Sequence, residues 1–341
     1  MTTHKILNYN SNNIAEIQSE SVDLIVTSPP YPMIEMWDDL FTEQDSEIGR
    51  LLKKNDGIGA FRKMHNILND VWSECDRVLK RNGFVCINIG DATRTIDGIF
   101  QLYSNHTEII NTFLNKGYCV LPDIHWRKQT NAPNKYMGSG MYPAGAYVTY
   151  EHEYILIFRK GGKRFFSGNK KNDRQESAFF WEERNVWFSD LWDLKGTSQS
   201  IQGKKSRERS AAYPFEIPYR LINMYSAKND TVLDPFWGLG TTSLACMMLE
   251  RNSIGVEIKA DIIDIAKERL TVPPKWLNDL IDARIERHLS FIDSLPNEKK
   301  DRCYINENHN FKVKTKQEQK ILFKKISNIK RTENMIVCEY E

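Results

Sequence analysis

The stretch Thr231-Val-Leu-Asp-Pro-Phe-Trp-Gly-Leu-Gly-Thr-Thr242 decides the fold class. An apolar run at 231–233 is followed by a turn with two glycines, and a helical pattern begins at 241. Glycine lets the backbone approach a ligand closely, and the first turn of a helix offers unpaired N–H groups. This strand–turn–helix unit indicates a ligand site, although an ordinary tight turn would use the same glycines.

Glu257 follows the next apolar run, 253–256, and strengthens this interpretation. A carboxylate at that place can accept hydrogen bonds from both hydroxyls of a ribose. The dinucleotide fingerprint would need a third glycine at position 243, where this chain has Ser243. We therefore expect a ribose-containing ligand and disfavour a nicotinamide or flavin cofactor.

Strands and helices alternate along most of the chain. The patterns predict strands at 22–27, 84–89, 118–126, 154–158, 231–233 and 253–256, and helices at 61–79, 100–116, 214–226, 241–251, 260–270 and 276–295. This alternation predicts a doubly wound, mostly parallel α/β sheet. The loop 128–150 and the polar stretch 161–210 are expected to be irregular.

A second motif, Thr27-Ser28-Pro29-Pro30-Tyr31, follows the expected strand 22–27. Two consecutive prolines stiffen a turn and fix the direction of its carbonyl groups. The motif is consistent with a turn capped by Ser28, with Tyr31 packed for structural reasons. Its place at the end of a buried strand favours a functional interpretation instead.

Composition excludes several classes of protein. With 341 residues, 40% of them hydrophobic, the chain is long enough for a sizeable core. No run approaches 18 apolar residues, and no apolar segment follows Met1–Lys5, so we expect neither a membrane helix nor a secretory signal. The six cysteines form no CxxC pair, so we expect reduced thiols, a cytoplasmic protein and no metal site.

Charge is unevenly distributed although the net charge is only +2. Basic residues concentrate at 159–174, 203–209 and 311–331, whereas 35–47 is acidic. A run of like charge is often only a solvated surface. Basic runs with interleaved aromatic residues also suit a polyanion such as nucleic acid.

Together the two motifs resemble those of the S-adenosylmethionine-dependent amino-methyltransferases of DNA, which methylate exocyclic nitrogens. The tetrad Ser28–Tyr31 and the loop Phe236-Trp-Gly-Leu-Gly240 match the family signatures D/N/S-P-P-Y/F/W and F-x-G-x-G. The tetrad precedes the loop, as in the beta group, whose sheet has a circularly rearranged strand order. The resemblance covers about residues 5–270 and implies S-adenosyl-L-methionine as cofactor and double-stranded DNA as substrate.

The resemblance also assigns site residues. Those implied for catalysis are Ser28, Pro29, Pro30 and Tyr31, and those implied for cofactor binding are Thr27, Pro214, Phe215, Asp234, Pro235, Phe236, Gly238, Gly240, Thr241, Thr242 and Glu257. The family often has an aspartate near the cofactor adenine, before the tetrad strand. This chain has only Asn8, Tyr9 and Asn10 there, so that contact is not expected in its usual form.

Four segments follow from the resemblance. Residues 1–160 would form the catalytic half of the methyltransferase domain, 161–210 a basic target-recognition insert, 211–272 the cofactor-binding half, and 273–341 a helical and basic C-terminal appendage. Within them, 151–160 resembles the last core strand of the family, and 211–221 resembles the helix that closes the methionine pocket. The sequence assigns no role to the acidic segment 35–47 or to 296–341.

The motif chemistry suits transfer to an amino group. The lone pair of that nitrogen is delocalised into the base, and acceptors such as the Ser28 hydroxyl and the Pro29 carbonyl would draw it toward a tetrahedral nitrogen. Tyr31 offers a flat face for a flipped base. No cysteine follows a proline, which disfavours methylation of a ring carbon. The transfer would then be direct and in line, without a covalent intermediate.

Serine in the first tetrad position is typical of cytosine-N4 enzymes and aspartate of adenine-N6 enzymes. We therefore expect cytosine N4 as the target, with adenine N6 as the alternative. An RNA methyltransferase and a non-catalytic DNA-binding protein with this fold are further alternatives. A restriction–modification system with a cognate endonuclease, and a homodimer, are expectations from the resemblance alone.

We expect the DNA contacts in the loop 128–150 and in the region 159–209, where basic side chains are the candidates. They are Arg164, Lys170, Lys171, Arg174, Lys204, Lys205, Arg207 and Arg209. Some would contact phosphates and one or two would contact guanine edges.

Overall fold

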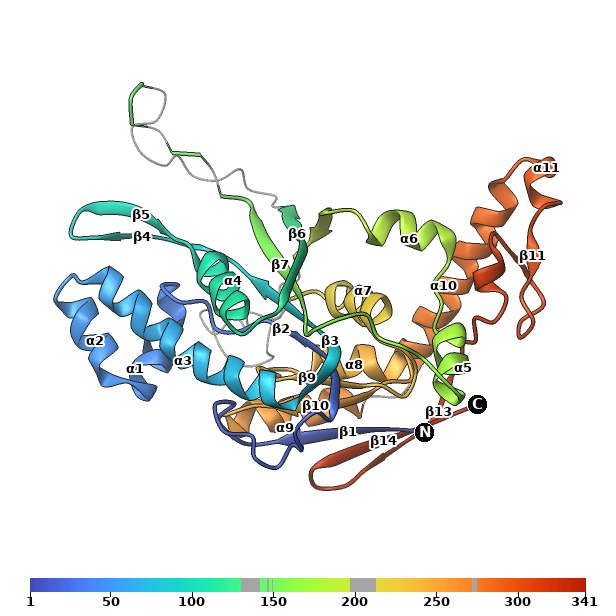
Figure 1. The fold of residues 1–341 in the computed structure, drawn as a ribbon, viewed down its shortest axis with the longest axis horizontal. Coiled ribbons are helices and arrows are strands. Elements are labelled where there is room, and N and C mark those ends of the chain that lie inside the picture. The colour runs from blue at the N-terminus through green and yellow to red at the C-terminus, as the bar shows by residue number, and fades with distance from the viewer. Residues whose placement is uncertain (130–141, 146, 149, 197–212, 272–274) are drawn as a thin grey trace.

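A computed structural model describes residues 1–341 except 130–141, 146, 149, 197–212 and 272–274. Its centre is a ten-stranded sheet (Figure 1). In spatial order the strands are β13 (Ile326–Arg331), β14 (Met335–Tyr340), β1 (Thr2–Leu7), β10 (Asn252–Val256), β9 (Thr231–Asp234), β2 (Val22–Thr27), β3 (Leu79–Ile89), β7 (His152–Arg159), β6 (Cys119–Gln129) and β8 (Leu191–Lys195). Within this described sheet, only β7 and β14 run against the common direction.

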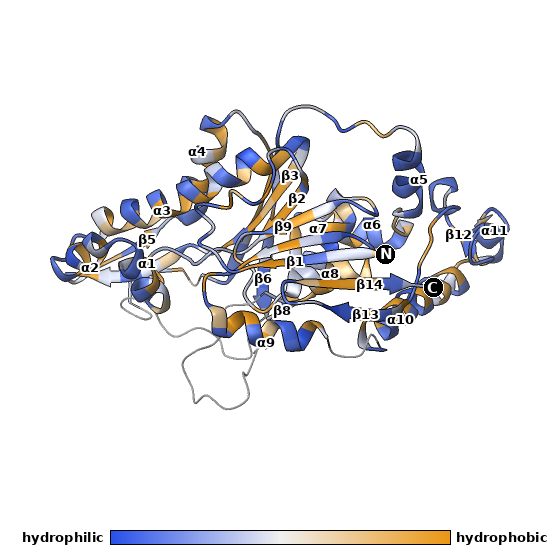
Figure 2. Cartoon of the chain, turned by 90° about the horizontal axis from the view of Figure 1, so that it is seen from below, coloured by the Kyte–Doolittle hydropathy of each residue, from blue (hydrophilic) through white to orange (hydrophobic). Residues whose placement is uncertain are grey.

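The parallel centre of the sheet is covered on both faces. All six residues of β2 are buried, which explains its unbroken apolar run. In register, Leu24 lies opposite Val232 of β9 and Phe84 of β3. Figure 2 shows the hydrophobic residues gathered in these central strands. The carboxyl ends of β2 and β9 therefore meet at one edge of the sheet.

Helices pack on both faces, which confirms the doubly wound prediction. One apolar core lies under α7 (Glu216–Tyr225), α8 (Thr241–Met248), α9 (Ala260–Leu270) and α10 (Lys275–Ser294). A second core lies under α1 (Asp38–Gln44), α2 (Ser46–Lys53), α3 (Gly57–Val78) and α4 (Asn105–Asn115). The short helix η1 (Glu35–Trp37) precedes α1.

The helix predicted at 100–116 begins only at Asn105. Residues before it form an antiparallel hairpin of β4 (Ala92–Ile96) and β5 (Ile99–Tyr103). Asp97 and Gly98 make its two-residue turn with φ values of 52° and 74°. Asp-Gly flanked by β-forming residues is a strong hairpin signal, and apolar spacing alone did not separate it from a helix.

The stretch 161–210, expected to be irregular, contains regular elements where it is described. These are α5 (Asn169–Glu176), α6 (Trp181–Trp187) and β8. β8 adds to β6 in parallel at the sheet edge, with Trp192 beside Trp126. Phe180, Trp187 and Trp192 are buried, so this stretch is partly built into the core.

The C-terminal part is not only a helical appendage. After α10 come α11 (Asn297–Lys300), β11 (Tyr304–Ile305), β12 (Lys312–Val313), η2 (Lys316–Glu318) and the hairpin β13–β14. β14 pairs antiparallel with β1, and its Ile336 and Cys338 are fully buried. The many lysines concealed this alternation of buried and exposed positions, so the prediction of an appendage was wrong for 326–340.

Membrane-spanning segments and disulfides are both absent from the part of the chain that the structure describes. None of the described helices has the length and apolar character needed to cross a membrane. All six cysteines lie within the described residues and each is a free thiol.

Candidate active site

The two sequence motifs meet where the winding of the sheet reverses. β9 leads into α8 on one face, whereas β2 leads toward α3 on the other. Such a switch point, at the carboxyl ends of parallel strands, is where open α/β sheets bind ligands. Thr27, the last residue of β2, donates a hydrogen bond from Oγ1 to Asp234 Oδ1 at 2.6 Å.

Asp234 ties three elements together from a buried position. Its Oδ1 also accepts from the Phe236 backbone N–H at 3.1 Å, and its Oδ2 accepts from Thr242 Oγ1 at 2.6 Å. Burial raises the pKa of Asp234 to about 6, because desolvation outweighs these hydrogen bonds, which favour the ionised form. This carboxylate fixes the start of α8 against the tetrad strand.

The glycine loop, residues 236–240, has a backbone conformation that residues other than glycine adopt only with strain. Gly238 and Gly240 have φ values of 51° and 72°, and a Cβ on Gly240 would lie 3.0 Å from Trp237 Cζ2. The Gly238 N–H donates to Glu257 Oε2 and the Lys259 N–H donates to Glu257 Oε1, each at 3.0 Å. Burial raises the pKa of Glu257. Each of its oxygens keeps a lone pair for a ligand hydroxyl.

Trp237 explains the serine at position 243. The indole covers Gly255, where an added Cβ would lie 2.2 Å from Trp237 Cδ1. Trp237 Nε1 donates to Ser243 Oγ at 2.8 Å, and Ser253 Oγ donates to the same oxygen at 2.9 Å. Ser243 therefore anchors the loop through a side chain that glycine lacks.

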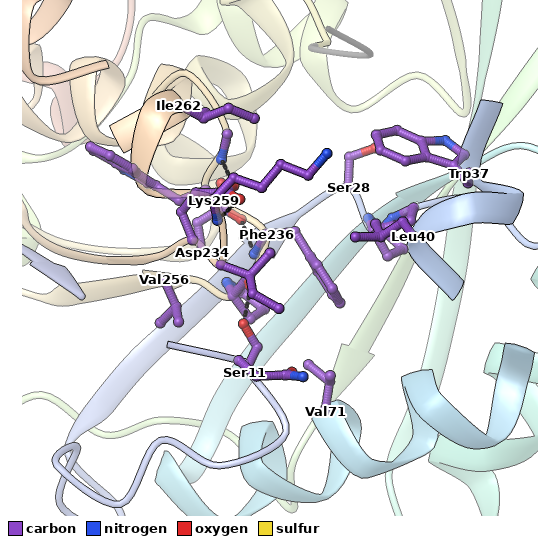
Figure 3. Close-up of a pocket in the computed structure, with 18 of the residues that line it drawn as sticks. Ser11, Ser28, Trp37, Leu40, Val71, Asp234, Phe236, Val256, Lys259 and Ile262 are labelled. Atoms are coloured by element: carbon purple, nitrogen blue, oxygen red, sulfur yellow. Dashed lines mark hydrogen bonds between the residues drawn. The ribbon is translucent and has the colours of Figure 1, made fainter. Parts of the chain in front are cut away.

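A pocket of about 1250 Å³, measured out to its open mouth, lies beside this loop (Figure 3). Ser28 and Pro29 of the tetrad line it together with Glu257 and Lys259, and Figure 3 shows Ser28 beside Trp37, with Lys259 near Asp234. Its other described lining residues include Asn10, Ser11, Pro30, Trp37, Leu40, Phe41, Gln44, Val71, Tyr213, Asp234, Pro235, Phe236, Gly238, Thr241, Val256, Ile258 and Ile262. The lining is largely apolar, with a smaller number of polar and charged side chains.

The acidic segment 35–47 forms one wall of this pocket. Trp37, Leu40 and Phe41 face it, while the guanidinium of Arg94 holds Asp38 from outside with contacts of 2.9 and 2.7 Å. Arg94 comes from β4, so the hairpin supports α1. Because the acidic residues of this segment hid its apolar face, its role was not predicted.

Asparagines replace the aspartate that the family often has near the adenine. Asn8 Nδ2 donates to the Glu257 and Ile258 carbonyls at 2.9 and 3.0 Å. Asn10 lines the pocket and donates to Gln44 Oε1 of α1 at 3.1 Å. This side of the pocket is therefore closed by neutral amides.

The tetrad continues into a buried polar network. Tyr31 Oη lies 3.1 Å from Ser28 Oγ and donates to Glu153 Oε2 of β7 at 2.8 Å. Asn88 Nδ2 of β3 donates to Glu153 Oε2 and to Tyr31 Oη, each at 2.7 Å. A Cβ on Gly90 would lie 3.0 Å from the Tyr31 ring, so glycine makes room for this packing.

Most of the residues assigned from the sequence come together here. Lining the pocket are Ser28, Pro29, Pro30, Asp234, Pro235, Phe236, Gly238, Thr241 and Glu257. Behind that lining, Thr27, Gly240 and Thr242 shape its frame. Pro214 and Phe215 are near the start of α7, but the neighbouring Tyr213 lines the pocket and bonds Thr242 at 2.6 Å.

Other residues of the site were not predicted. Asn88 and Glu153 belong to strands recognised only by their apolar neighbours, and no local pattern marks them. The alternation His152-Glu153-Tyr154 in an otherwise apolar strand was the available signal, because a buried charge needs a reason.

Those candidate DNA contacts that the structure describes lie away from the pocket. Arg164 binds the buried Asp230 through both Nη atoms at 2.6 and 2.7 Å, and Lys170 lies 3.4 Å from the same carboxylate. Asp230 precedes β9, so this ion-pair cluster is at the sheet edge opposite Ser28. Lys171 and Arg174 are exposed on α5 of that side, and Lys204, Lys205, Arg207 and Arg209 lie outside the described residues.

Fold and pocket together define a methyltransferase-like α/β enzyme with its ligand site at the switch point. The DNA methylase family model matches residues 22–268, and this chain belongs to that family. The model takes in both N6 and N4 enzymes.

Two relatives match most of the chain. It is 51% identical to the Type II methyltransferase M.MthZI of Methanothermobacter thermautotrophicus over 96% of this chain and 93% of that protein. It is 46% identical to the Type II methyltransferase M.MjaI of Methanocaldococcus jannaschii over 80% of this chain and 93% of that protein.

Solved structures share the fold. A putative DNA modification methylase from Thermus thermophilus, complexed with S-adenosyl-L-methionine, has a TM-score of 0.61 at 28% identity, over 78% of this chain and 94% of that one. The PvuII DNA methyltransferase, described as cytosine-N4-specific, has a TM-score of 0.53 at 16% identity over 84% and 94%, which speaks for the fold alone.

Proposed function

We propose that this DNA methylase transfers a methyl group from S-adenosyl-L-methionine to N4 of cytosine in double-stranded DNA. The observation that carries the proposal is that Ser28 and Pro29 line the same pocket as Glu257. A methyl donor in that pocket would face an amino group held at the tetrad. This is a group-transfer geometry that a binding protein would not need.

The pocket residues fit this cofactor. Glu257 has one free lone pair on each carboxylate oxygen for the two ribose hydroxyls. Phe236, Val256 and Ile258 offer apolar surface beside it for the adenine. The sulfonium of the cofactor supplies an already activated methyl group, so the chain needs no nucleophile of its own. Proximity and alignment then account for most of the acceleration.

Residues of the tetrad would prepare the base. The Ser28 hydroxyl and the Pro29 carbonyl accept hydrogen bonds from the amino group and turn its lone pair toward the pocket. Tyr31 is fixed by hydrogen bonds to Asn88 and Glu153, so its ring orientation is set before a base arrives. A base stacked on that ring must leave the duplex, which requires base flipping.

Serine in the first tetrad position supports cytosine N4 over adenine N6. A neutral hydroxyl is a weaker acceptor than a carboxylate. The choice between the two bases rests on Ser28, because the family includes enzymes of both kinds. The relatives are named Type II methyltransferases, which supports a place in a restriction–modification system with a cognate endonuclease. Dimer formation stays a prediction.

The proposed DNA contacts are revised by the structure. Arg164 and Lys170 are held by Asp230, so they are poor candidates. Arg127 and Lys128, near the end of β6, are also paired, with Glu151 and Glu153, so the same criterion does not favour them over the predicted contacts. The contribution of Lys204, Lys205, Arg207 and Arg209 stays a prediction.

Product identification tests the proposal. Purified protein is incubated with mixed-sequence duplex DNA and S-adenosyl-L-methionine, and the digested nucleosides are compared with standards by mass spectrometry. We expect N4-methylcytosine. N6-methyladenine would overturn the choice of base and keep the rest. Methylated RNA but unmodified DNA would overturn the substrate, and cofactor binding without any product would favour a non-catalytic DNA-binding protein.

A further inference from the structure

Glu153 is a buried carboxylate directly behind the catalytic tetrad. It is only 8% exposed, yet its Oε2 accepts hydrogen bonds from Tyr31 Oη at 2.8 Å and Asn88 Nδ2 at 2.7 Å. Its Oε1 forms an ion pair with Lys128, whose side chain is 40% exposed. Burying a charge is costly, so a carboxylate kept at this place needs an explanation beyond packing.

Methyl transfer to an amino group creates a need for a proton acceptor. The nitrogen gains a fourth bond and must release one hydrogen to become the neutral product. Neither the Ser28 hydroxyl nor the Pro29 carbonyl is a base strong enough to keep that proton. Among the described residues, Glu153 is the carboxylate that the tetrad contacts through Tyr31. Asp234, another buried carboxylate, contacts Thr27 instead.

The hydroxyls of Ser28 and Tyr31 form a continuous chain of hydrogen bonds that ends at Glu153 and could carry a proton. Ser28 Oγ is 3.1 Å from Tyr31 Oη, and Tyr31 Oη is 2.8 Å from Glu153 Oε2. Asn88 donates to both Tyr31 Oη and Glu153 Oε2, so Tyr31 Oη keeps its own hydrogen for the carboxylate. The route therefore has one direction, from the base toward Glu153. Lys128 faces the second oxygen and lies toward solvent.

We propose that Glu153 is the terminal proton acceptor of the reaction and acts through Tyr31 and Ser28. The inference rests on the proposed function. The amino nitrogen forms the N–C bond with its lone pair, and the electrons of the breaking C–S bond stay on sulfur. One amino proton moves to Ser28 Oγ, the Ser28 proton moves to Tyr31 Oη, and the Tyr31 proton moves to Glu153 Oε2. The positive charge of the donor is thus cancelled by the carboxylate charge.

Glu153→Gln separates this role from a positioning role. Glutamine keeps the size and one oxygen that accepts from Tyr31 and Asn88, but it cannot take up a proton. We expect the single-turnover rate of methyl transfer to fall by roughly 100-fold or more. Dissociation constants for DNA and for S-adenosyl-L-methionine, measured by titration calorimetry, should stay within about threefold of the wild type. Glu153→Asp should recover part of the rate.

The pH profile gives a second readout. Among the described residues, the charged or titratable groups that contact Glu153 are Lys128 and Tyr31. In the wild type the single-turnover rate should fall in acid, because a protonated Glu153 cannot accept a proton. The Glu153→Gln variant should lose that dependence. Tyr31→Phe keeps the ring and removes the relay oxygen, and its rate should fall similarly.

Glu151→Gln is the matched control. Glu151 lies two residues away, is exposed and pairs only loosely with Arg127 at 3.5 Å, so its rate should equal that of the wild type. A Glu153→Gln rate within about threefold of the wild type would overturn the inference and leave the proposed function intact. A wild-type protein that methylates no DNA would overturn the proposed function itself.

Discussion

In the proposed mechanism, Ser28 is the side chain on which methyl transfer depends most directly. Ser28→Ala removes one acceptor for the amino group and leaves in place Glu257 and Phe236, which line the same pocket. We expect turnover to fall by roughly 100-fold, in line with the loss of one positioned polar group at a reacting centre. Binding of S-adenosyl-L-methionine, measured by calorimetry, should stay near normal. Full activity of Ser28→Ala would contradict the assigned mechanism.

Asp234 makes stability depend on pH in an unusual direction for a carboxylate. Its pKa is about 6 in the fold against an ordinary value of 3.8, so the folded state binds its proton more tightly than the unfolded state. The resulting stabilisation is complete below pH 3.8 and is lost as the pH rises through about 6.

Asp234→Asn should remove this dependence. The amide is neutral at every pH and can still accept from Thr27 and donate to Thr242. Between about pH 4.5 and 7.5, we expect the free energy of unfolding to decline less in the variant than in the wild type. The difference should be about 2 kcal/mol, because roughly 1.5 units of the Asp234 pKa shift lie above about pH 4.5. Urea unfolding at the two pH values measures it. Equal changes in both proteins would show that Asp234 does not titrate in this range.

Single residues differ in how well the sequence revealed them. The tetrad and Glu257 follow buried strands, so their position at a sheet edge could be predicted from local pattern. Glu153 and Asn88 could not, because their role depends on β3 and β7 lying side by side. The ion pair of Arg164 could not be predicted for the same reason, because its partner Asp230 is distant in sequence.

Among the elements, α1 has an importance its sequence concealed. It covers the pocket with Leu40 and Phe41, and the Arg94–Asp38 pair joins it to the β4–β5 hairpin. The two side chains are 15% and 20% exposed, so the pair is partly shielded from solvent. One acidic residue of 35–47, Asp38, therefore attaches this segment to Arg94.

Arg94→Ala should loosen this wall. We expect the dissociation constant of S-adenosyl-L-methionine to rise about fivefold, corresponding to roughly 1 kcal/mol for a partly buried ion pair, mainly through faster dissociation. Stopped-flow displacement measures the rate. Arg62→Ala, on the exposed side of α3, is a control that should change nothing. An unchanged dissociation rate in Arg94→Ala would show that α1 stays closed without the pair.

Elements with long apolar periods were predicted well. The helix at 260–270 was predicted with its observed bounds, and β2 likewise. The hairpin 92–103 was missed because its apolar residues also fit a helical period, and only the Asp97-Gly98 turn distinguishes the two.

At the scale of the whole molecule, the C-terminal hairpin completes the sheet. Ile336→Asp would place a charge in the core between β14 and β1, where Ile336 is fully buried opposite His4. We expect a loss of about 3–4 kcal/mol of stability. Thermal unfolding and size-exclusion chromatography measure it, since an uncovered β1 edge also promotes aggregation.

Met335→Asp is the matched control for this prediction. Met335 is the neighbouring residue on β14 and is 37% exposed, so its substitution should change the unfolding temperature little. Equal effects of the two substitutions would show that β14 contributes no more than a surface strand.

The overall architecture could be predicted because the tetrad and the glycine loop each follow a strand, and the carboxyl ends of parallel strands lie at one edge of the sheet. The extension by β13 and β14 was not, since it depends on pairing between β1 and a hairpin more than three hundred residues further along the chain. The unbroken apolar runs predicted that the sheet would be covered on both faces. Pairing between strands so far apart in the sequence leaves no local pattern from which it could be predicted.

That pairing has a consequence for synthesis on the ribosome. β1 lies between β10 and β14, so its hydrogen-bonding edges find no partner until both of these much later strands have been made. In the nascent chain β1 therefore stays unpaired until late, although most of its residues are buried in the finished fold. Such a long-range closure slows folding and exposes the chain to chaperones. A polypeptide whose translation stops before β14 would therefore leave the outer edge of β1 unpaired. Such an open edge would make the truncated product prone to aggregation and degradation.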